Sequence, residues 1–366
     1  MKKSGVYISV ISVVISFAVL YGARQRRPWA FDAARFRYEG VTQLASESAS
    51  SLNFHEARLK LDPSASAYAS LAAALFSEAK RSDRDDLYER ARAAANESLR
   101  QSPFGNQVAR LVLIKSAQAR HEFTRSLNMI AEFEKEFGVK DQAEVLKITA
   151  YLALAEGEKA RTAAGRLVER IPVSNSFVLR ALAFEKTGQL ANALEDFEAA
   201  ISLEDASDAQ TASWSRSLAA RFYLNAGMYA EAELILREAL KAQPDSAFAL
   251  SLLGKTLRKL DRFAESEAAT LGAYSIAPNP VFLTELGILY RDFGQAGKAM
   301  EFFDAAEKVL REDLANGRYG HRLQLMDLLL ERNSNPQEIV TLGREELAVR
   351  PIPEVYEKIA AAERRM

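Results

Sequence analysis

Few residues of this chain have the types and the spacing that metal binding or catalysis requires. Only three histidines occur, His55, His121 and His321, and they lie far apart in the sequence. None has a second ligand three or four residues away, the spacing that places two side chains on one face of a helix. The sequence therefore predicts no metal site.

Two short strings look like pieces of catalytic or nucleotide-binding motifs. Ser77 and Lys80 form a Ser-x-x-Lys string, but the partner motifs of the enzymes that use it are absent. Gly294 and Gly297 fall in a predicted helix–helix turn, and the Lys-Ser/Thr pair that completes a phosphate-binding loop does not follow them. We therefore predict a protein that is not an enzyme and has no cofactor.

Charge and cysteine content exclude further classes of function. Lys and Arg total 48 against 49 Asp and Glu, so the chain has no overall positive field that would attract a nucleic acid. The absence of cysteine excludes disulfides, thiolate metal sites and a lipid-modified cysteine anchor. Any attachment to a membrane must therefore come from the chain itself.

The amino-terminal segment is the one candidate for such an attachment. Residues 5–23 are uncharged and apolar, with Lys2 and Lys3 before them and three arginines among residues 24–27. As a helix, these 19 residues would span roughly 28 Å, close to the hydrocarbon thickness of a bilayer. Trp29, Phe31 and Phe36 are aromatic residues that suit a membrane interface. We predict an uncleaved transmembrane helix within residues 1–27; a cleaved signal peptide is the alternative.

The side of the membrane and the oligomeric state stay open at this point. Arginine and lysine counts around the segment favour a cytoplasmic body, whereas the Lys-Lys start and the lack of cysteine favour a periplasmic one. We expect a single-pass protein of a bacterial inner membrane and lean towards a periplasmic body. A stripe of small residues would allow a homo-oligomer to form through the anchor; it consists of Gly5, Ser9, Ser12 and Ser16.

The rest of the chain repeats itself. Residues 213–244 and 247–278 align at a shift of 34 residues, and each block contains two amphipathic stretches with apolar residues three and four apart. That spacing is the helical period, so each block predicts a helical hairpin. Units of this kind begin near residues 107, 141, 174, 213, 247, 280 and 320, and a degenerate unit covers residues 64–105.

The repeat resembles the tetratricopeptide repeat, because small residues recur at positions 8, 20 and 27 of each unit. Two helices that cross closely need small side chains at such positions. Position 8 is Ala181, Ala220, Gly254 and Gly287; position 20 is Ala160, Ala193, Ala232, Ser266 and Ala299; position 27 is Ala200, Ala239, Ala273 and Ala306. The last unit departs from this pattern, with Asp327 at position 8 and Glu346 at position 27.

The resemblance implies an all-α fold, a right-handed superhelical solenoid of hairpins that follows the transmembrane helix. We divide the chain into the anchor at 1–27, a helical juxtamembrane region with a degenerate repeat at 28–106, an array of about seven units at 107–352, and a capping helix at 353–366. The polar face of the last helix suits the exposed end of a solenoid.

The family binds peptides or helices on the concave face, which the first helix of each unit lines. Positions that face this groove in the family are Trp214, Ser217, Arg221, Asn225, Phe248, Ser251, Lys255, Arg258, Lys259 and Arg291. Cations beside two aromatic residues suit an acidic peptide or helix. The alternative is that these side chains bind no partner and only keep the face soluble.

Together these features predict a protein-binding scaffold at a bacterial membrane, in an envelope biogenesis, secretion or motility complex. Two alternatives stay open. One is an enzyme or regulatory subunit with an unrecognised site in residues 30–105, and the other is a secreted repeat protein whose leader is removed.

Overall fold

The structure is a computed structural model that describes residues 31–40, 48–82, 84–205, 207–317 and 319–366. These residues form eighteen α-helices and two short 3-10 helices and contain no strand, which confirms the prediction of an all-helical fold. Among the described helices, none combines the length and hydropathy that crossing a bilayer requires. The predicted membrane helix at residues 5–23 lies outside the described part of the chain.

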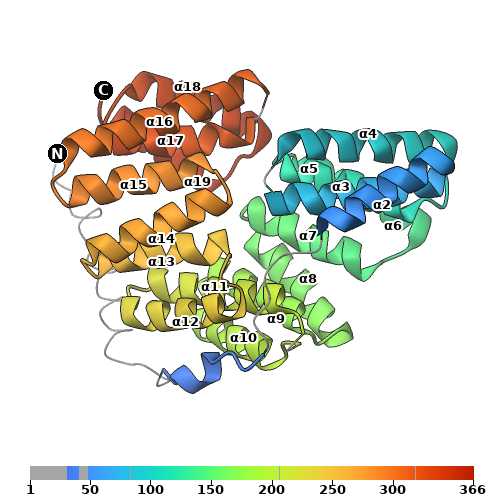
Figure 1. Ribbon diagram of the computed structural model, residues 1–366, viewed down its shortest axis with the longest axis horizontal. Helices are drawn as coiled ribbons and strands as arrows, with labels where there is room; N and C mark the ends of the chain where they lie inside the picture. The colour runs from blue at the N-terminus through green and yellow to red at the C-terminus, as the bar shows by residue number, and fades with distance from the viewer. Residues whose placement is uncertain (1–30, 41–47, 83, 206, 318) are drawn as a thin grey trace, which may run out of the picture.

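Sixteen of the α-helices pair into eight antiparallel hairpins, and their starts follow the predicted repeat (Figure 1). The hairpins are α3 (Ala65–Ser82) with α4 (Asp85–Gln101), α5 (Gln107–Ala119) with α6 (Phe123–Phe137), α7 (Asp141–Ala153) with α8 (Gly157–Arg170), α9 (Ser174–Lys186) with α10 (Leu190–Ser202), α11 (Ala209–Asn225) with α12 (Tyr229–Ala242), α13 (Ala247–Lys259) with α14 (Phe263–Ile276), α15 (Pro280–Asp292) with α16 (Ala296–Ala315), and α17 (Arg322–Glu331) with α18 (Pro336–Val349). Helix α2 (Ser48–Leu61) precedes the first hairpin, and α19 (Pro353–Glu363) follows the last.

The small residues of the repeat lie where the two helices of a hairpin cross. Ala181, Ala193, Ala220 and Ala232 are fully buried. At Gly287 a Cβ atom would come within 2.4 Å of the Phe303 ring. Close packing at these crossings leaves no room for a larger side chain, which is the physical reason for the repeated Ala and Gly.

The first helices of the units lie on the inside of the curve. Helices α9, α11, α13 and α15 each contact the first helix of the next unit, whereas the described second helices pack against their own partners and the next first helix and make no extensive contact with one another. Because first helices approach one another more closely than second helices do, the array bends around them. The inner face of the array is therefore built from first helices, as predicted.

Residues 31–38 lie far from the hairpins that follow them in the sequence. This segment, which we call the strap, contains the 3-10 helix η1 (Ala33–Phe36) and lies between α10 and α12 (Figure 1). Phe36 is 1% exposed and belongs to the core formed by α9–α13, and Phe31 packs against the same core. The assignment of these two aromatics to a membrane interface is therefore wrong, because protein side chains cover them. In the predicted helical juxtamembrane region at 28–106, the described residues before α3 are helical only at η1 and α2.

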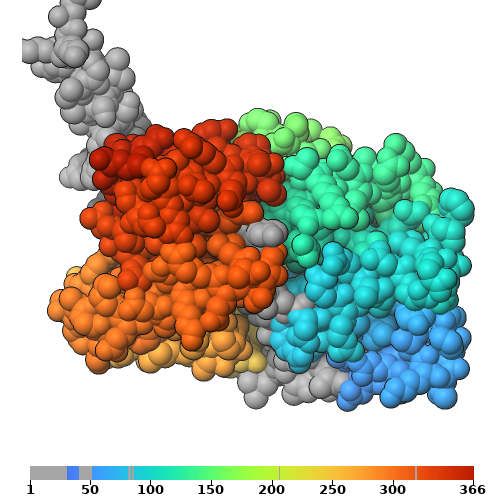
Figure 2. Space-filling view, turned by 90° about the horizontal axis from the view of Figure 1, so that it is seen from above, coloured from blue at the N-terminus to red at the C-terminus, as the bar shows by residue number. Residues whose placement is uncertain are grey.

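The array curves until its two ends meet. The amino-terminal end contributes His121 and Phe123, and the carboxy-terminal end contributes Gly320 and His321 of the loop before α17, together with Arg350. A Cβ atom on Gly320 would lie 2.1 Å from Cδ2 of His121, and the Arg350 guanidinium lies 6.0 Å from the centre of the Phe123 ring. We call this contact the seam. It borders a cavity of about 780 Å³ lined by both ends, and Figure 2 shows the red C-terminal helices against the teal N-terminal hairpins.

Candidate partner-binding face

The residues predicted to bind a partner lie on α11, α13 and α15, three consecutive first helices of the inner face. The structure brings these helices side by side, so their side chains form one continuous surface. On this surface the cations do not stand alone. All but one of the predicted cations are paired with a carboxylate, and the partners come mainly from neighbouring units.

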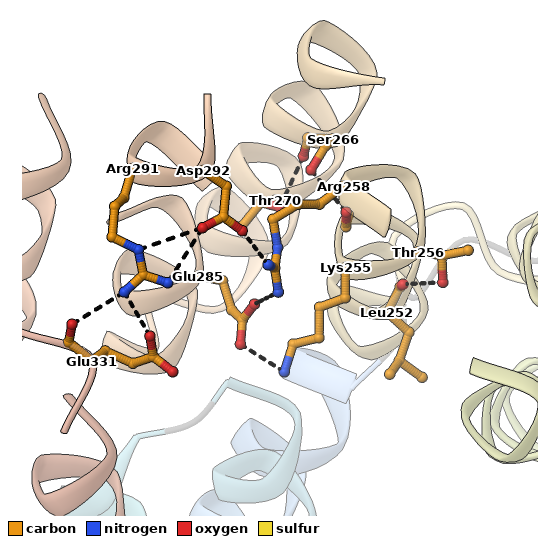
Figure 3. A network of polar contacts seen from close by, with 11 residues as sticks. Leu252, Lys255, Thr256, Arg258, Ser266, Thr270, Glu285, Arg291, Asp292 and Glu331 are labelled. Atoms are coloured by element: carbon orange, nitrogen blue, oxygen red, sulfur yellow. Dashed lines mark hydrogen bonds and ion pairs between the residues drawn. The ribbon is translucent and has the colours of Figure 1, made fainter. Parts of the chain in front are cut away.

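The centre of the face is a network of four charged residues from α13 and α15 (Figure 3). Lys255 Nζ lies 2.9 Å from Glu285 Oε1, and Arg258 Nη1 lies 2.6 Å from Asp292 Oδ2. A second contact of 3.7 Å joins Arg258 Nη2 to Glu285 Oε2. Because both cations belong to α13 and both carboxylates to α15, the network ties two units together.

The same arrangement extends in both directions along the inner face. Arg291 of α15 reaches the next unit, where its Nη1 lies 2.7 Å from Glu331 Oε2 at the end of α17 (Figure 3). Arg221 of α11 reaches back to α9, with Nη2 3.2 Å from Glu185 Oε2. Each pair joins the first helices of two successive units, so the pairs help to set the angle between units.

Four predicted residues of this face are exposed, and among them Arg291 is held in an ion pair. Phe248 is 37% exposed, and both Lys259 and Asn225 are exposed at the ends of their helices. Among the described residues, no ion pair is formed by Lys259. Trp214 is only partly buried, but it packs against the hydrophobic core of α9–α13.

Two positions that the family pattern placed in the groove are buried instead. Ser217 is fully buried and its hydroxyl donates to the Ser213 carbonyl at 2.7 Å, and Ser251 is 7% exposed. The Ser251 hydroxyl likewise donates to a carbonyl of its own helix, that of Phe248, at 3.0 Å. Because both side chains are buried and bonded within their own helices, the prediction that they face the groove is wrong.

The electrostatics of the face are nearly balanced. Five cations, at residues 221, 255, 258, 259 and 291, lie beside four carboxylates, at residues 185, 285, 292 and 331. One oxygen of Glu285 is buried and accepts no hydrogen bond from the described residues. The face therefore offers both donors and acceptors to a partner, and its long-range attraction for an acidic peptide is small.

The other residues considered for catalysis or metal binding lie outside this face. Ser77 and Lys80 are exposed on α3. His121 and His321, two hundred residues apart in sequence, meet at the seam, where His321 Nδ1 lies 2.7 Å from Asp313 Oδ2. In the described part of the chain, no group of three or more His, Asp and Glu side chains is placed to hold a metal ion.

The repeated hairpins and the inner face define a helical-repeat solenoid. The sequence matches the family model described as tetratricopeptide repeat at residues 174–207 and 216–246, which cover the α9–α10 hairpin and most of α11–α12. The chain therefore contains tetratricopeptide repeats over these residues. No curated protein matches its sequence.

Solved structures with a similar fold include the APC/C hetero-tetramer Cut9-Hcn1, with a TM-score of 0.52 and 14% identity over 80% of this chain and 55% of that one. The chain thus spans about half the length of that protein. A tetratricopeptide repeat protein from Parabacteroides merdae ATCC 43184 matches with a TM-score of 0.46 and 14% identity, over 65% of this chain and 92% of that one. At these identities the likeness concerns the fold alone.

Two features with functional potential were missed by reasoning from the sequence. One is the strap, and the other is Arg216, which is 2% exposed and binds the strap. The only available signal was the 39-residue step between the units at 174 and 213, which is longer than the usual 34. That step indicated an insertion, but it could not show what fills the space that an insertion opens.

Proposed function

We propose that this protein is a non-catalytic scaffold that binds partner proteins along the inner face of α11, α13 and α15. The observation that supports this role is the continuous surface of first helices, on which ion pairs fix the geometry while Phe248, Asn225 and Lys259 stay accessible. A fixed surface with a few exposed anchor residues binds an extended peptide or a helix with little loss of its own entropy.

The proposed partner is an extended peptide or helix that carries an acidic group near an apolar side chain. Lys259 offers an ammonium that forms no ion pair with the described residues, and Phe248 offers an apolar contact near the other end of α13. Further N–H groups come from the four paired cations of the face, Arg221, Lys255, Arg258 and Arg291. The Glu and Asp side chains paired with these cations compete with a partner for the same N–H groups. Binding is therefore local rather than driven by a basic field.

We further propose that residues 5–23 hold the protein in a bacterial inner membrane with the array in the periplasm, where it serves an envelope complex. The intact mass of the mature protein tests the anchor, because removal of a leader would lower the mass by the first twenty or so residues. Protease digestion of spheroplasts tests the side: a periplasmic array is degraded in intact spheroplasts, whereas a cytoplasmic one survives until lysis.

Partner binding is tested best with residues that take no part in the ion pairs. Charge reversal of Arg221, Lys255 and Arg258 would place new carboxylates against existing ones, so a lost partner could reflect a distorted array. We instead suggest Phe248→Ser with Lys259→Glu in the full-length protein, followed by cross-linking in membranes and affinity capture. We expect partners recovered with the wild type to be depleted at least about tenfold, the effect of losing about 1.4 kcal/mol.

The matched control changes the outer helices by the same residue types. Leu271→Ser with Lys308→Glu removes one exposed apolar residue and one exposed cation from α14 and α16, which are second helices. This control should recover every partner. Equal recovery of all partners by both variants would refute the proposed face, and equal loss would show that the binding surface is not confined to it.

A further inference from the structure

The strap occupies a space that the repeat itself leaves open. The step from the unit at 174 to the unit at 213 is 39 residues instead of 34, and the extra residues are divided between the loop at 203–208 and the start of α11, which begins at Ala209. The strap contacts both α10 and α12, two second helices on the outer side of the array (Figure 1). The inserted loop therefore lies next to a groove between the outer helices α10 and α12. The strap, which is distant from these helices in sequence, fills this groove.

Aromatic residues provide the apolar part of this contact. The rings of Phe31 and Phe36 stack at 5.5 Å, and Tyr223 of α11 meets them edge-on at 5.5 Å and 5.9 Å. Tyr38 packs against a small cluster at the ends of α11 and α12. The groove therefore has two apolar subsites, a deep one for Phe36 and a shallower one for Tyr38.

The polar part of the contact recognises the main chain of the strap. Arg216 Nε donates to the Phe36 carbonyl at 2.8 Å, and Nη2 donates to the Arg37 carbonyl at 3.0 Å. The Glu238 carboxylate accepts the Tyr38 N–H at 3.0 Å. Glu204 forms an ion pair with Arg216, whose guanidinium lies 5.4 Å from the centre of the Tyr38 ring.

Such a combination is the chemistry of a peptide-binding site rather than of ordinary core packing. Main-chain carbonyls are held by a buried cation, and two side chains separated by one residue enter separate subsites. The Arg35 side chain adds an ion pair with Glu198 of α10. If the strap leaves, Arg216 exchanges two carbonyl acceptors for water, and the apolar subsites that held Phe36 and Tyr38 become exposed, which is unfavourable. The empty groove therefore favours a replacement with the same chemistry.

We propose that the groove between α10 and α12 is a second peptide-binding site, specific for an extended basic–aromatic–x–aromatic segment, and that the strap is its internal, displaceable ligand. The strap supplies this pattern as Arg35, Phe36, Arg37 and Tyr38. The site is on the outer side of the array, so it does not depend on the proposed role of the inner face. A partner that carries the same pattern would compete with the strap and release the amino-terminal segment from the array.

The strap competes with an added peptide for the groove, and this competition determines how far the apparent affinity for the peptide is weakened. A tethered segment has an effective concentration on the order of 1 mM. If the free groove binds the peptide with a Kd of about 10 μM, the tethered strap weakens the apparent affinity about 100-fold. A peptide in solution should therefore bind poorly to the wild type and well to a protein whose strap cannot dock.

The test uses a fluorescent peptide of residues 31–40 and three full-length proteins. Phe36→Ala with Tyr38→Ala should disable the strap, and we expect this protein to bind the peptide about 100-fold more tightly than the wild type does. Adding Arg216→Gln to that variant should weaken binding by at least about tenfold, because the carbonyl contacts lose their charged donor. A peptide with alanine in place of its Phe36 and Tyr38 residues should bind none of the three.

A second measurement needs no variant and covers the case in which the altered strap prevents folding. In the wild type, several millimolar peptide should accelerate hydrogen exchange of the strap amides while α10 and α12 stay protected. Equal peptide affinity for the wild type and the strap variant would overturn the proposal. So would strap amides that do not respond to the peptide in the wild type.

Discussion

At the scale of single residues, the turn between the two helices of a hairpin imposes one backbone conformation whatever the side chain. Gly188, Gly227 and Gly294 have φ values between +74° and +77°, as expected for glycines that end a first helix. The equivalent residue of other units is not glycine, yet its φ is also positive. These residues are His121, Ala155, Asp261 and Asn333. The hairpin geometry therefore dictates the conformation, and glycine is only its least strained occupant.

The first prediction follows from this difference. Ala155 has φ +57°, a conformation that strains any residue with a Cβ atom, and its side chain is exposed. Ala155→Gly should raise the free energy of unfolding by about 0.5–1 kcal/mol, after allowing for the greater freedom of glycine in the unfolded chain. The reciprocal change Gly188→Ala should lower it by about 1 kcal/mol, since no atom lies within 4 Å of the added Cβ and only backbone strain acts. Denaturant midpoints that shift in the same direction for both changes would contradict this account.

A second prediction concerns the crossing of the two helices in one hairpin. Gly287→Ala should destabilise the protein by about 1–3 kcal/mol, because its Cβ would overlap the buried Phe303 ring. Gly297→Ala on α16 is the control. No atom lies within 4 Å of a Cβ there, so the change should stabilise the helix by up to about 1 kcal/mol. Thermal unfolding of both variants checks the prediction, and similar shifts would show that crossing distance does not matter.

At the scale of elements, the irregular last unit has a physical explanation. Asp327 and Glu346 stand where the repeat expects small residues, and both are met by cations from the end of the chain. Lys358 of α19 pairs with Asp327, and Arg350 Nη2 lies 2.7 Å from Glu346 Oε1. Because no further hairpin stacks on this unit among the described residues, charged residues can replace the small ones. The array ends where a polar helix satisfies them.

The positions of the hairpins could be predicted from the sequence because each one is encoded locally. Small residues at fixed spacing, apolar residues at the helical period and turn glycines all lie within 34 residues of one another. The long α16 and the loop between α10 and α11 also matched the two long steps in the repeat. The ion pairs of the inner face could not be predicted, since they depend on the angle between units and on side-chain reach. The exposure of Phe248 followed from its repeat position, whereas the burial of Ser217 did not.

The third prediction tests the capping role of α19. Its Val355 and Ala362 side chains are fully buried against the last hairpin, so removal of residues 353–366 would uncover the core around Met326 and Ile339. We expect truncation at residue 352 to lower the thermal midpoint and to cause concentration-dependent association through the exposed end. Light scattering over a range of concentrations measures the association. Removal of residues 364–366 alone is the control, and it should leave the protein in the wild-type oligomeric state.

At the scale of the whole molecule, the strap and the seam join parts of the chain that are far apart in sequence. Arg216 binds carbonyls about 180 residues away, and His121 meets a loop 200 residues away. No local pattern records either contact, because both arise from the total curvature of eight hairpins and from one insertion between them. The three isolated histidines of the sequence thus gave no indication that two of them would share one site.

The seam leads to the last prediction, which concerns pH. Burial lowers the pKa of His121 to about 4, and the positive charges of Arg350 and His321 add to this effect. Other charged residues line the same cavity, namely Asp86, Glu89, Arg120, Glu122, Arg322 and Glu346. A solvent-exposed histidine has a pKa near 6.5, so closing the seam keeps His121 neutral where an open seam would let it take up a proton. Above pH 6.5 His121 is neutral in both states and does not oppose closure; as the pH falls from 6.5 to 4 the closed seam becomes progressively less stable than the open one, and below pH 4 this destabilisation reaches about 3 kcal/mol.

We therefore expect the array to open as the pH falls from 6.5 to 4, because the described helices of the two ends make no extensive contact with one another and the seam rests on a few side chains, among them His121, Phe123 and Arg350. Small-angle scattering should show a larger radius of gyration at pH 4.5 than at pH 7, while circular dichroism shows unchanged helix content. His121→Asn is the matched control: asparagine tolerates the φ of +60° at this position and does not titrate. This variant should keep the same dimensions at both pH values. Equal expansion of the two proteins would assign the opening to the carboxylates of the array, and the absence of expansion in the wild type would show that protonation of His121 does not control the seam.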